Sequence, residues 1–411
     1  MLWKLIKKDY NSTFSLTTIG WKRFIKNKVS FSALLFIGVL IIISILGYLI
    51  VPDNTPFSNN QILEISGKNP GFKANILLIK KNITISKKNF LYRMFFGTES
   101  EYIYQPFYSY YFSGDSIYIE ELTGDTPNNG PLKSYNIADV SYALVPNSVK
   151  RIGRVISFID VNGAVQSQSI EELQNIVKSK HIIKKFFLLG TDRFGRDMLS
   201  RIVIGARISL SVGFISVFIA LTIGIILGSL SGYYGGKIDQ LIVWLINVVW
   251  SIPTFLLVIA ITFALGKGFW QVFVAVGLTM WVDVARVLRG QIMGIKEKEF
   301  VEAAKALGYK NNRIIIKHIL PNTIGPIFVI AASNFASAIL MEAGLSFLGI
   351  GVQPPMPSWG TMIRDHSAYI ILGSPWLAII PGFAIMLTVL AFMLIGNGLR
   401  DAMDVKINYT S

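Results

Sequence analysis

The sequence contains no cysteine and only three histidines. The absence of cysteine excludes disulfides, thiolate catalysis, cysteine-ligated zinc and iron–sulfur clusters. The histidines, His181, His318 and His366, are far apart in the sequence, so no metal site is expected. Charged residues are also scarce, at 15% of 411 residues, against roughly 25% in an ordinary soluble domain. Hydrophobic residues make up 52% of the chain, and this composition indicates a membrane protein.

The net charge of +15 is unevenly distributed along the chain. Residues 52–200 hold 17 basic and 14 acidic side chains, so most of the basic excess lies outside this segment, between hydrophobic runs. Basic loops between apolar runs are typical of membrane proteins. We therefore expect membrane lipid as a partner and no nucleic acid.

Six apolar runs are candidates for membrane-spanning helices. The first, 31–51, has about the 20 residues that a bilayer requires. It exceeds the 7–15 apolar residues of a signal peptide and ends at Pro52 without a small-residue cleavage site, which favours a retained helix. Pro253, inside the third run, should kink its helix, either as a gate hinge or as a static bend. The other runs are 208–230, 241–265, 269–284, 324–350 and 376–396.

The segment between the first two runs has a different character, because it is polar, rich in aromatic residues and strand-like. Asp115 to Glu120 alternates with period two, and Asn162-Gly163 is a hairpin turn signal. Ser169 and Glu172 have the spacing of a capping box that starts a short helix. The predicted fold is therefore an all-α polytopic membrane protein of about six helices, with an α+β insert between the first two.

The basic residues also predict an orientation. Residues 1–30 carry seven of them and 286–317 carry eight, whereas the short loops on the other side carry only Lys267 and Arg364. By the positive-inside rule, both termini are cytoplasmic and the insert lies outside. The predicted organisation is a cytoplasmic segment 1–30, a first helix 31–51, an outer insert and pre-helix segment 52–205, a five-helix core 206–400 with a cytoplasmic loop 286–322, and a cytoplasmic tail 401–411.

The cytoplasmic loop has a helical pattern of its own. Phe300, Ala303, Ala304 and Leu307 follow the spacing i, i+3, i+4, i+7 and so share one apolar face. Gly308 can end this helix in a left-handed conformation. A second helix should follow and end at residue 320, before a proline. The apolar face could pack against the chain's own bundle, but a stripe ringed by charge favours a protein interface.

Motifs in several separate segments resemble a known family. Residues 302–304, Gly308 and the pair Leu320-Pro321 resemble the cytoplasmic "EAA" loop of ABC importer permeases. Residues 342–351, 357–360 and 399–404 are similar to the C-type subunit of the oligopeptide/dipeptide/nickel branch. The segment before the second span also resembles this branch, through Gly190, Thr191, Asp192, Gly195, Arg196 and Asp197. The resemblance covers 188–405 closely and the first 50 residues loosely, and the insert, roughly 55–185, is the departure.

The resemblance implies a pore-forming permease subunit of an ATP-driven importer, for peptides, in the bacterial inner membrane. Its expected partners are a second homologous permease, two ABC ATPase subunits and an extracytoplasmic substrate-binding protein. The loop would be the coupling helix that docks on the ATPase, through Phe300, Glu302, Ala303, Ala304, Leu307, Gly308, Leu320 and Pro321.

Catalysis is not expected on this chain. A phosphate-binding P-loop needs Gly-Lys-Ser/Thr, and the nearest candidate, Gly235-Gly236-Lys237, continues with Ile238. ATP and Mg²⁺ would therefore bind the partner ATPase, with no cofactor here. The alternative function is a membrane-anchored sensor or assembly protein that works through its ectodomain. No cytoplasmic segment exceeds about 40 residues, below the size that folds alone, which disfavours a sensor output domain.

Polar residues within or beside the spans leave alternatives open. Glu342 lies inside the fifth span, where it could line the pore, contact another subunit or be a hydrogen-bonded structural residue. Trp359, in the last outer loop, could contact substrate or a binding protein, or anchor the interface. Asp283 and Arg286 are spaced to form a structural ion pair.

Overall fold

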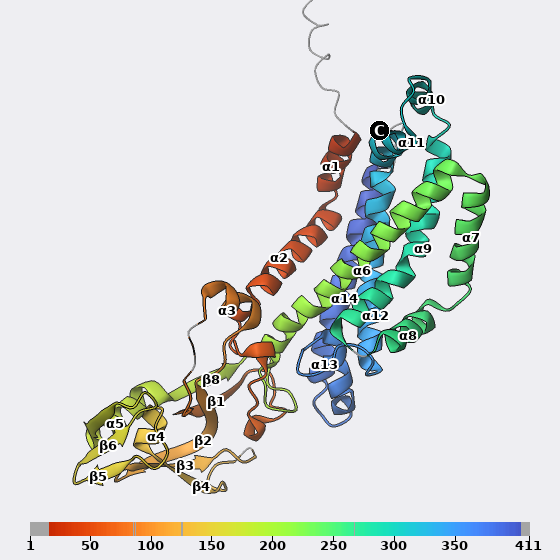
Figure 1. Cartoon of the computed structure of the whole chain (residues 1–411). Helices are drawn as coiled ribbons and strands as arrows, with labels where there is room; N and C mark the ends of the chain where they lie inside the picture. The colour runs from red at the N-terminus through yellow and green to blue at the C-terminus, as the bar shows by residue number, and fades with distance from the viewer. Residues whose placement is uncertain (1–15, 85, 87, 125, 267, 404–411) are drawn as a thin grey trace, which may run out of the picture.

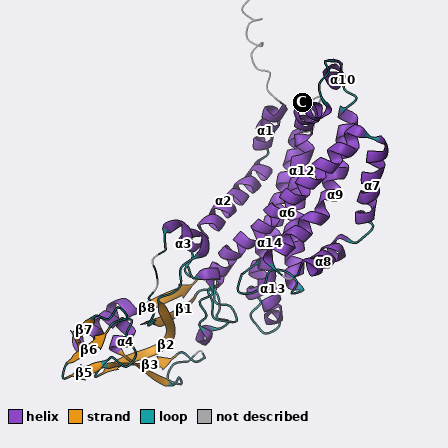
Figure 2. Ribbon diagram, in the orientation of Figure 1, coloured by secondary structure: helices purple, strands orange, loops and turns teal. Residues whose placement is uncertain are grey.

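The computed structural model describes residues 16–84, 86, 88–124, 126–266 and 268–403 (Figure 1). The predictions for residues 1–15 of the N-terminal segment, for Lys267 and for residues 404–411 of the tail lie outside the described residues. Most of the chain is helical, and the strands are confined to one end of the elongated molecule (Figure 2).

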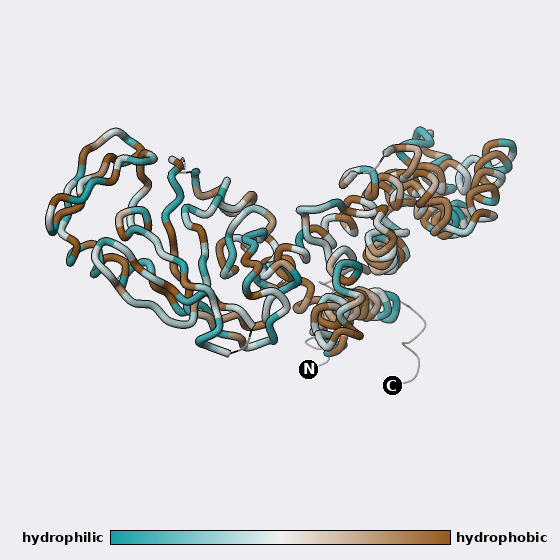
Figure 3. The backbone as a smooth tube through the Cα atoms, turned by 90° about the horizontal axis from the view of Figure 1, so that it is seen from below, coloured by the Kyte–Doolittle hydropathy of each residue, from teal (hydrophilic) through white to brown (hydrophobic). Residues whose placement is uncertain are grey.

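Five helical segments among the described residues are long and apolar enough to cross a membrane. They contain α2 (Lys28–Ile50), α6 (Met198–Tyr234), α9 (Phe269–Ile295), α12 (Ile324–Phe347) and α14 (Trp376–Met403). A short helix, α1 (Leu16–Lys26), precedes them. Viewed from below, hydrophobic residues dominate these helices, whereas the sheet region is mixed (Figure 3). The structure therefore agrees with a largely helical membrane protein.

Glycines on one face of α6 allow α9 to approach closely. At Gly228 an added Cβ would lie 2.7 Å from the carbonyl oxygen of Ala285, and at Gly224 it would lie 2.4 Å from Cβ of Val284. Small residues four apart are typical of tightly packed membrane helices. The α6–α9 pair is thus a close backbone contact at the centre of the bundle.

The third predicted span is not one kinked helix. It consists of α7 (Gly236–Trp250) and α8 (Thr254–Leu265), whose axes differ by 92°. Pro253 occupies the N-cap of α8 and has no N–H to continue the hydrogen-bond ladder of α7. Among the described residues, the number of spans reaches six only if this bent pair counts as one. The pair has the form of a broken span or a re-entrant loop.

The core begins earlier than the predicted boundary at residue 206. Helix α6 starts at Met198 and has 37 residues, or about 55 Å at 1.5 Å per residue. A bilayer core of roughly 30 Å cannot cover this length. The predicted boundary therefore falls inside a helix that runs continuously from the bundle to the insert (Figure 1).

The insert is built on a five-stranded antiparallel sheet with the order β4-β3-β2-β1-β8. A second sheet has three strands, in the order β5-β6-β7. The first sheet contains β1 (Phe72–Lys80), β2 (Tyr102–Ser113), β3 (Ser116–Glu121), β4 (Leu132–Asn136) and β8 (Ile182–Phe187). The second contains β5 (Lys150–Ile152), β6 (Val155–Ile159) and β7 (Val165–Ser169). Three short helices accompany them, α3 (Phe90–Phe96), α4 (Ile137–Ser141) and α5 (Ile170–Ile176).

Local predictions within the insert are confirmed. Gly163 has φ 84° in the turn between β6 and β7, and Ser169 and Glu172 form both bonds of the capping box at α5. The neighbouring residues Ile76 and Leu77 of β1 belong to different hydrophobic clusters, and both are fully buried. Since adjacent strand residues point to opposite faces, the large sheet is covered on both sides. The insert is therefore a folded body with a core of its own.

Candidate functional site

The loop predicted at 286–322 contains a short helix and a sharp turn. Helix α10 (Glu299–Ala306) lies at the end of the bundle opposite the insert (Figure 1). Gly308 has φ 76°, as predicted, and its N–H donates to the carbonyl of Lys305. An added Cβ at Gly308 would meet nothing within 4 Å, so the backbone conformation, not space, favours glycine here.

The apolar residues of α10 lie on two sides of the helix, one facing the bundle and one facing away from it. Val301 and Ala304 are buried against α9 and the following helical turns. Phe300, Ala303 and Leu307 are exposed, Leu307 at 72%. We call these three residues the outer stripe. The expectation that Ala304 faces a partner is therefore wrong, because the chain's own helices cover the side of α10 on which Ala304 lies. Val301, which sequence reasoning missed, is three residues before Ala304 and shares its side.

A continuous cluster connects α10 to the membrane helices. Leu288 and Ile292 of α9 pack with Val301, Ala304 and further apolar side chains in one buried group. One tertiary and one local contact hold the turn as well. The Tyr233 hydroxyl donates to Oδ1 of Asn311 at 2.8 Å, and within the loop Arg313 lies over the Tyr309 ring at 4.2 Å. Displacement of α10 would therefore be passed directly to α9.

The second helix of the loop does not end at Leu320. Helix α11 (Asn311–Ile314) passes through a π turn (Ile315–Ile319) and a 3-10 turn (Leu320–Thr323) into α12. Pro321 is tolerated because it stands in the first positions of the 3-10 turn, where its missing N–H costs no helical hydrogen bond. Leu320 packs partly buried against the α10–α9 cluster, while Pro321 is exposed. The loop is thus rigidly continuous with α12.

Charged residues around α10 and α9 differ in their pairing from the sequence expectation. The Glu302 side chain is exposed and makes no hydrogen bond or ion pair with the residues that the structure describes. Within the same described ranges, Asp283 and Arg286 form no ion pair, because the Arg286 guanidinium lies 3.4 Å above the centre of the Trp250 ring. Arg289, one turn further along α9, pairs with Asp239 of α7 at 2.6 and 2.7 Å.

Glu342 and Trp359 lie in the interior of the bundle. Glu342 is 0% exposed and accepts hydrogen bonds from Ser346 at 2.7 Å and from Ser209 of α6 at 3.4 Å. Trp359, the first residue of α13 (Trp359–His366), is 1% exposed and donates its indole N–H to the carbonyl of Ile202 at 3.0 Å. The tryptophan is therefore a packing residue between α6 and α13 and not a surface anchor. The geometry at Glu342 is that of a hydrogen-bonded structural carboxyl.

The motif before α6 forms a buried ionic turn. Asp192 is 0% exposed, accepts from Nε of Arg196 at 2.6 Å and lies 3.6 Å from Nε of Arg201. Arg201, not singled out from the sequence, completes this charge group. Asp197 caps α6 by accepting from the backbone N–H of Ser200 at 2.7 Å.

The same turn fastens the insert to α6. The Thr191 N–H donates to the carbonyl of Lys68, and the Ile62 N–H donates to the carbonyl of Phe194. Gly195 has φ 69°, and an added Cβ there would lie 1.6 Å from the Ile62 carbonyl oxygen. Gly190 is equally confined, with φ 74° and a carbonyl oxygen 2.3 Å from the Cβ position. The motif therefore works as the structural joint between the two bodies.

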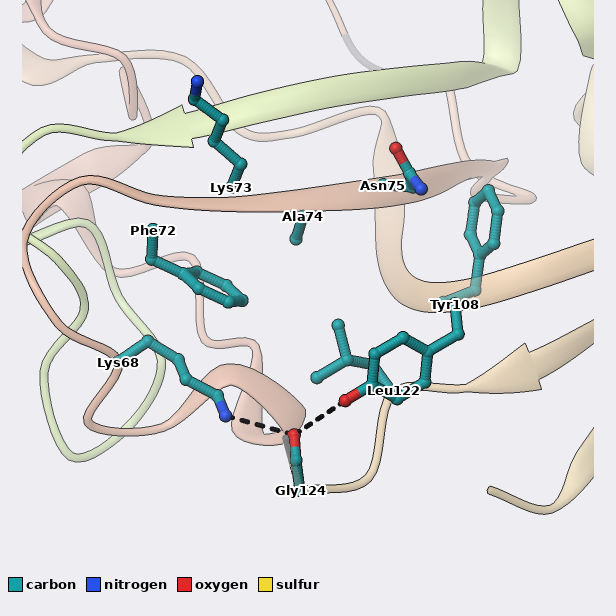
Figure 4. A pocket seen from close by; sticks show the side chains of 9 residues that line it. Lys68, Phe72, Lys73, Ala74, Asn75, Tyr108, Leu122 and Gly124 are labelled. Carbon is teal, nitrogen blue, oxygen red and sulfur yellow. Dashed lines mark hydrogen bonds between the residues drawn. The ribbon is translucent and has the colours of Figure 1, made fainter. Parts of the chain in front are cut away.

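The insert has a small pocket that the sequence did not indicate (Figure 4). It has a volume of about 160 Å³ and lies beside β1 and β2. Nζ of Lys68 and the hydroxyl of Tyr108 both donate to the carbonyl of Gly124, at 3.2 and 2.9 Å. These polar groups thus close one end of the pocket by bonding to the chain itself.

Metal-ligand side chains do not gather anywhere in the described part of the chain. His181 and His366 are buried, and a ring nitrogen of each lies 2.7 Å from a backbone carbonyl, those of Leu78 and Met362. Burial lowers the pKa of both imidazoles below the ordinary value. These histidines are hydrogen-bonded core residues.

Two family models match the chain. Residues 224–409 match the binding-protein-dependent transport system inner membrane component, and residues 15–64 match the N-terminal membrane domain of oligopeptide transport permease C. The first match contains α10 and its turn, and the second contains α2. The insert lies almost entirely outside both matches.

Curated relatives agree with these matches. The dipeptide transport system permease protein DppC of Alkalihalophilus pseudofirmus is 48% identical over 53% of this chain and 71% of its own length. The oligopeptide transport system permease protein OppC of Haemophilus influenzae is 44% identical over 56% of this chain and 74% of its own length. The glutathione transport system permease protein GsiD of Pectobacterium atrosepticum is 42% identical over 53% of this chain and 72% of its own length. The chain therefore belongs to the family of binding-protein-dependent transport system inner membrane components and is a multi-pass permease subunit of an ABC importer.

Proposed function

We propose that this permease subunit forms half of the pore of a peptide importer and is driven by ATPase subunits that dock on the outer stripe of α10. The observation that carries the proposal is this exposed apolar stripe on a helix whose other face is buried against α9. The relatives are named for dipeptide, oligopeptide and glutathione transport, and glutathione is itself a small peptide. These names support peptides as the substrate class.

The proposed coupling is mechanical. An ATPase bound to Phe300 and Leu307 would move α10 when it changes conformation. The buried contacts of Val301 and Ala304 would transmit this movement to α9. The unbroken helical path from Asn311 to α12 gives a second route into the bundle. Hydrolysis itself would take place on the partner, which binds ATP and Mg²⁺, so this subunit is non-catalytic.

The proposed assembly contains a second homologous permease, two ABC ATPase subunits and an extracytoplasmic substrate-binding protein. A single α10 offers one docking helix, so two permeases are needed to engage two ATPases. The family description supports the binding protein, since its transport systems depend on one. The comparisons give no support to the alternative of a membrane-anchored sensor or assembly protein.

We propose a topology with both termini in the cytoplasm and the insert outside. Helices α1 and α10 lie at one end of the bundle and the sheets at the other (Figure 1). If the α10 end is cytoplasmic, the insert is therefore on the outer side of the membrane. The basic residues near α10 favour the cytoplasm for that end.

The absence of cysteine permits a direct test of this topology. Ile152→Cys, on exposed β5, should react with a membrane-impermeant maleimide added to intact spheroplasts. Lys310→Cys, on the exposed turn after α10 and outside the outer stripe, should react only after the membrane is permeabilised. Labelling of Lys310→Cys, but not Ile152→Cys, from outside would reverse the orientation.

The transport function can be tested by reconstitution. We expect the complex with its ATPases, second permease and binding protein to accumulate labelled dipeptides or oligopeptides in liposomes when ATP is supplied on the ATPase side. The matched control is the same complex with the binding protein left out, which should neither accumulate peptide nor show peptide-stimulated hydrolysis. Hydrolysis that no tested peptide stimulates, with nickel uptake in its place, would contradict the substrate class.

A further inference from the structure

Helix α3 is a short helix with unusual exposure. Its sequence is Phe-Leu-Tyr-Arg-Met-Phe-Phe, and none of its residues is buried. Its five large apolar and aromatic side chains are between 44% and 62% exposed: Phe90, Leu91, Tyr92, Phe95 and Phe96. The insert has a complete core elsewhere, so this exposure does not reflect a lack of folded structure. Contiguous apolar exposure of this kind marks an interaction surface.

The depth of α3 is fixed by contacts to the end of a membrane-spanning helix. Arg207 of α6 donates to the carbonyl of Phe95 at 3.0 Å and lies over the rings of Phe95 and Tyr48, at 5.0 and 5.7 Å. Tyr48 is two residues before the last residue of α2. Thr98 N–H also donates to the carbonyl of Asn54 at 2.9 Å. Helix α3 is therefore held level with the C-terminal end of α2.

The surroundings of α3 match the chemistry of a membrane interface. Helix α3 lies next to the C-terminal end of α2 (Figure 1), where the apolar residues Leu49 and Ile50 of this membrane-spanning helix are exposed. Exposed Arg93, and Lys88, whose Nζ lies 5.3 Å from the Tyr92 ring centre, supply positive charge at the same level. Aromatic side chains flanked by Lys and Arg are enriched where lipid headgroups meet acyl chains.

We propose that α3 is an interfacial membrane anchor, which lies in the headgroup region of the bilayer leaflet next to the insert and binds lipid. The occupant is lipid because α3 continues the lipid-facing surface of a spanning helix and carries both aromatic and basic groups. The insert would then be attached at two places: to α6 through the buried ionic turn at Asp192, and to the lipid through α3. Together they hold the insert against the membrane surface.

The proposal is tested with single cysteines in the cysteine-free chain. Phe96→Cys and Leu91→Cys are labelled with an environment-sensitive NBD fluorophore, and the assembled complex is placed in vesicles of phosphatidylethanolamine and phosphatidylglycerol. Ile152→Cys, which is 70% exposed on β5, is the matched control. We expect blue-shifted emission at both α3 sites, and quenching by headgroup-level nitroxide lipids several-fold stronger than at Ile152→Cys.

Two results would overturn the anchor. Water-like emission at both α3 sites, with no quenching by nitroxide lipids, would show that the helix stays in solvent. Blue-shifted emission without lipid quenching would show that a protein partner covers α3. Both α3 sites are exposed in the chain, so neither substitution removes a core contact, and the control variant reports whether labelling itself disturbs the insert.

Discussion

Replacement of Leu307 by aspartate is expected to abolish transport while the permease still inserts into the membrane. Leu307 is 72% exposed, so the substitution removes little packing within the chain. Within a docked apolar face, the new carboxylate would be buried without a partner, which costs about 3–5 kcal/mol. The ATPase should then dissociate, which co-purification measures, and peptide uptake should be lost with it.

Three further variants of the same loop complete the experiment, one as a control and two as additional losses of function. Lys310→Ala, on the exposed turn, should leave uptake nearly unchanged. Gly308→Val should abolish coupling through the backbone, since a β-branched residue at φ 76° is strained by about 1–3 kcal/mol. Ala304→Asp should also abolish transport, but by placing a charge inside the chain's own cluster. Wild-type uptake by Leu307→Asp, with the ATPase bound, would show that the outer stripe is not the docking surface.

Replacement of Asp192 by alanine is expected to destabilise the chain strongly at the joint between the insert and α6. Asp192 is fully buried between Arg196 and Arg201, both nearly buried themselves. Removal of one partner from a buried ionic group costs about 3–5 kcal/mol, because the remaining charges are left unpaired. We expect a lower thermal unfolding temperature of the purified complex and faster proteolysis between the insert and α6.

A matched control for Asp192 is an exposed ion pair in the insert. Glu101, which pairs with Lys80, is half exposed, and an exposed pair contributes about 0–1 kcal/mol. Glu101→Ala should therefore leave the unfolding temperature and the protease pattern unchanged. If Asp192→Ala were as stable as Glu101→Ala, the motif would not be a structural joint.

Some features of the chain follow from residues close together in the sequence. Hydropathy located most of the apolar segments, although helix ends moved, as with α6 beginning at Met198 instead of residue 208. The hairpin turn at Gly163, the capping box at Ser169 and the left-handed Gly308 were also predictable. Each depends on backbone geometry and hydrogen bonds within a few residues, which neighbouring side chains alone can specify.

Other features depended on residues distant in the sequence, and only the tertiary structure decided them. Periodicity placed Ala304 on an apolar face, but the position of α9 determined that this side chain points inward while Leu307 points outward. The burial of Trp359 required α6, more than 150 residues earlier. The 92° angle between α7 and α8 likewise exceeds what Pro253 alone implies. In each case the sequence determined which side chains were apolar or charged, and packing between distant segments determined which of them were left for a partner, because burial is a property of neighbours in space.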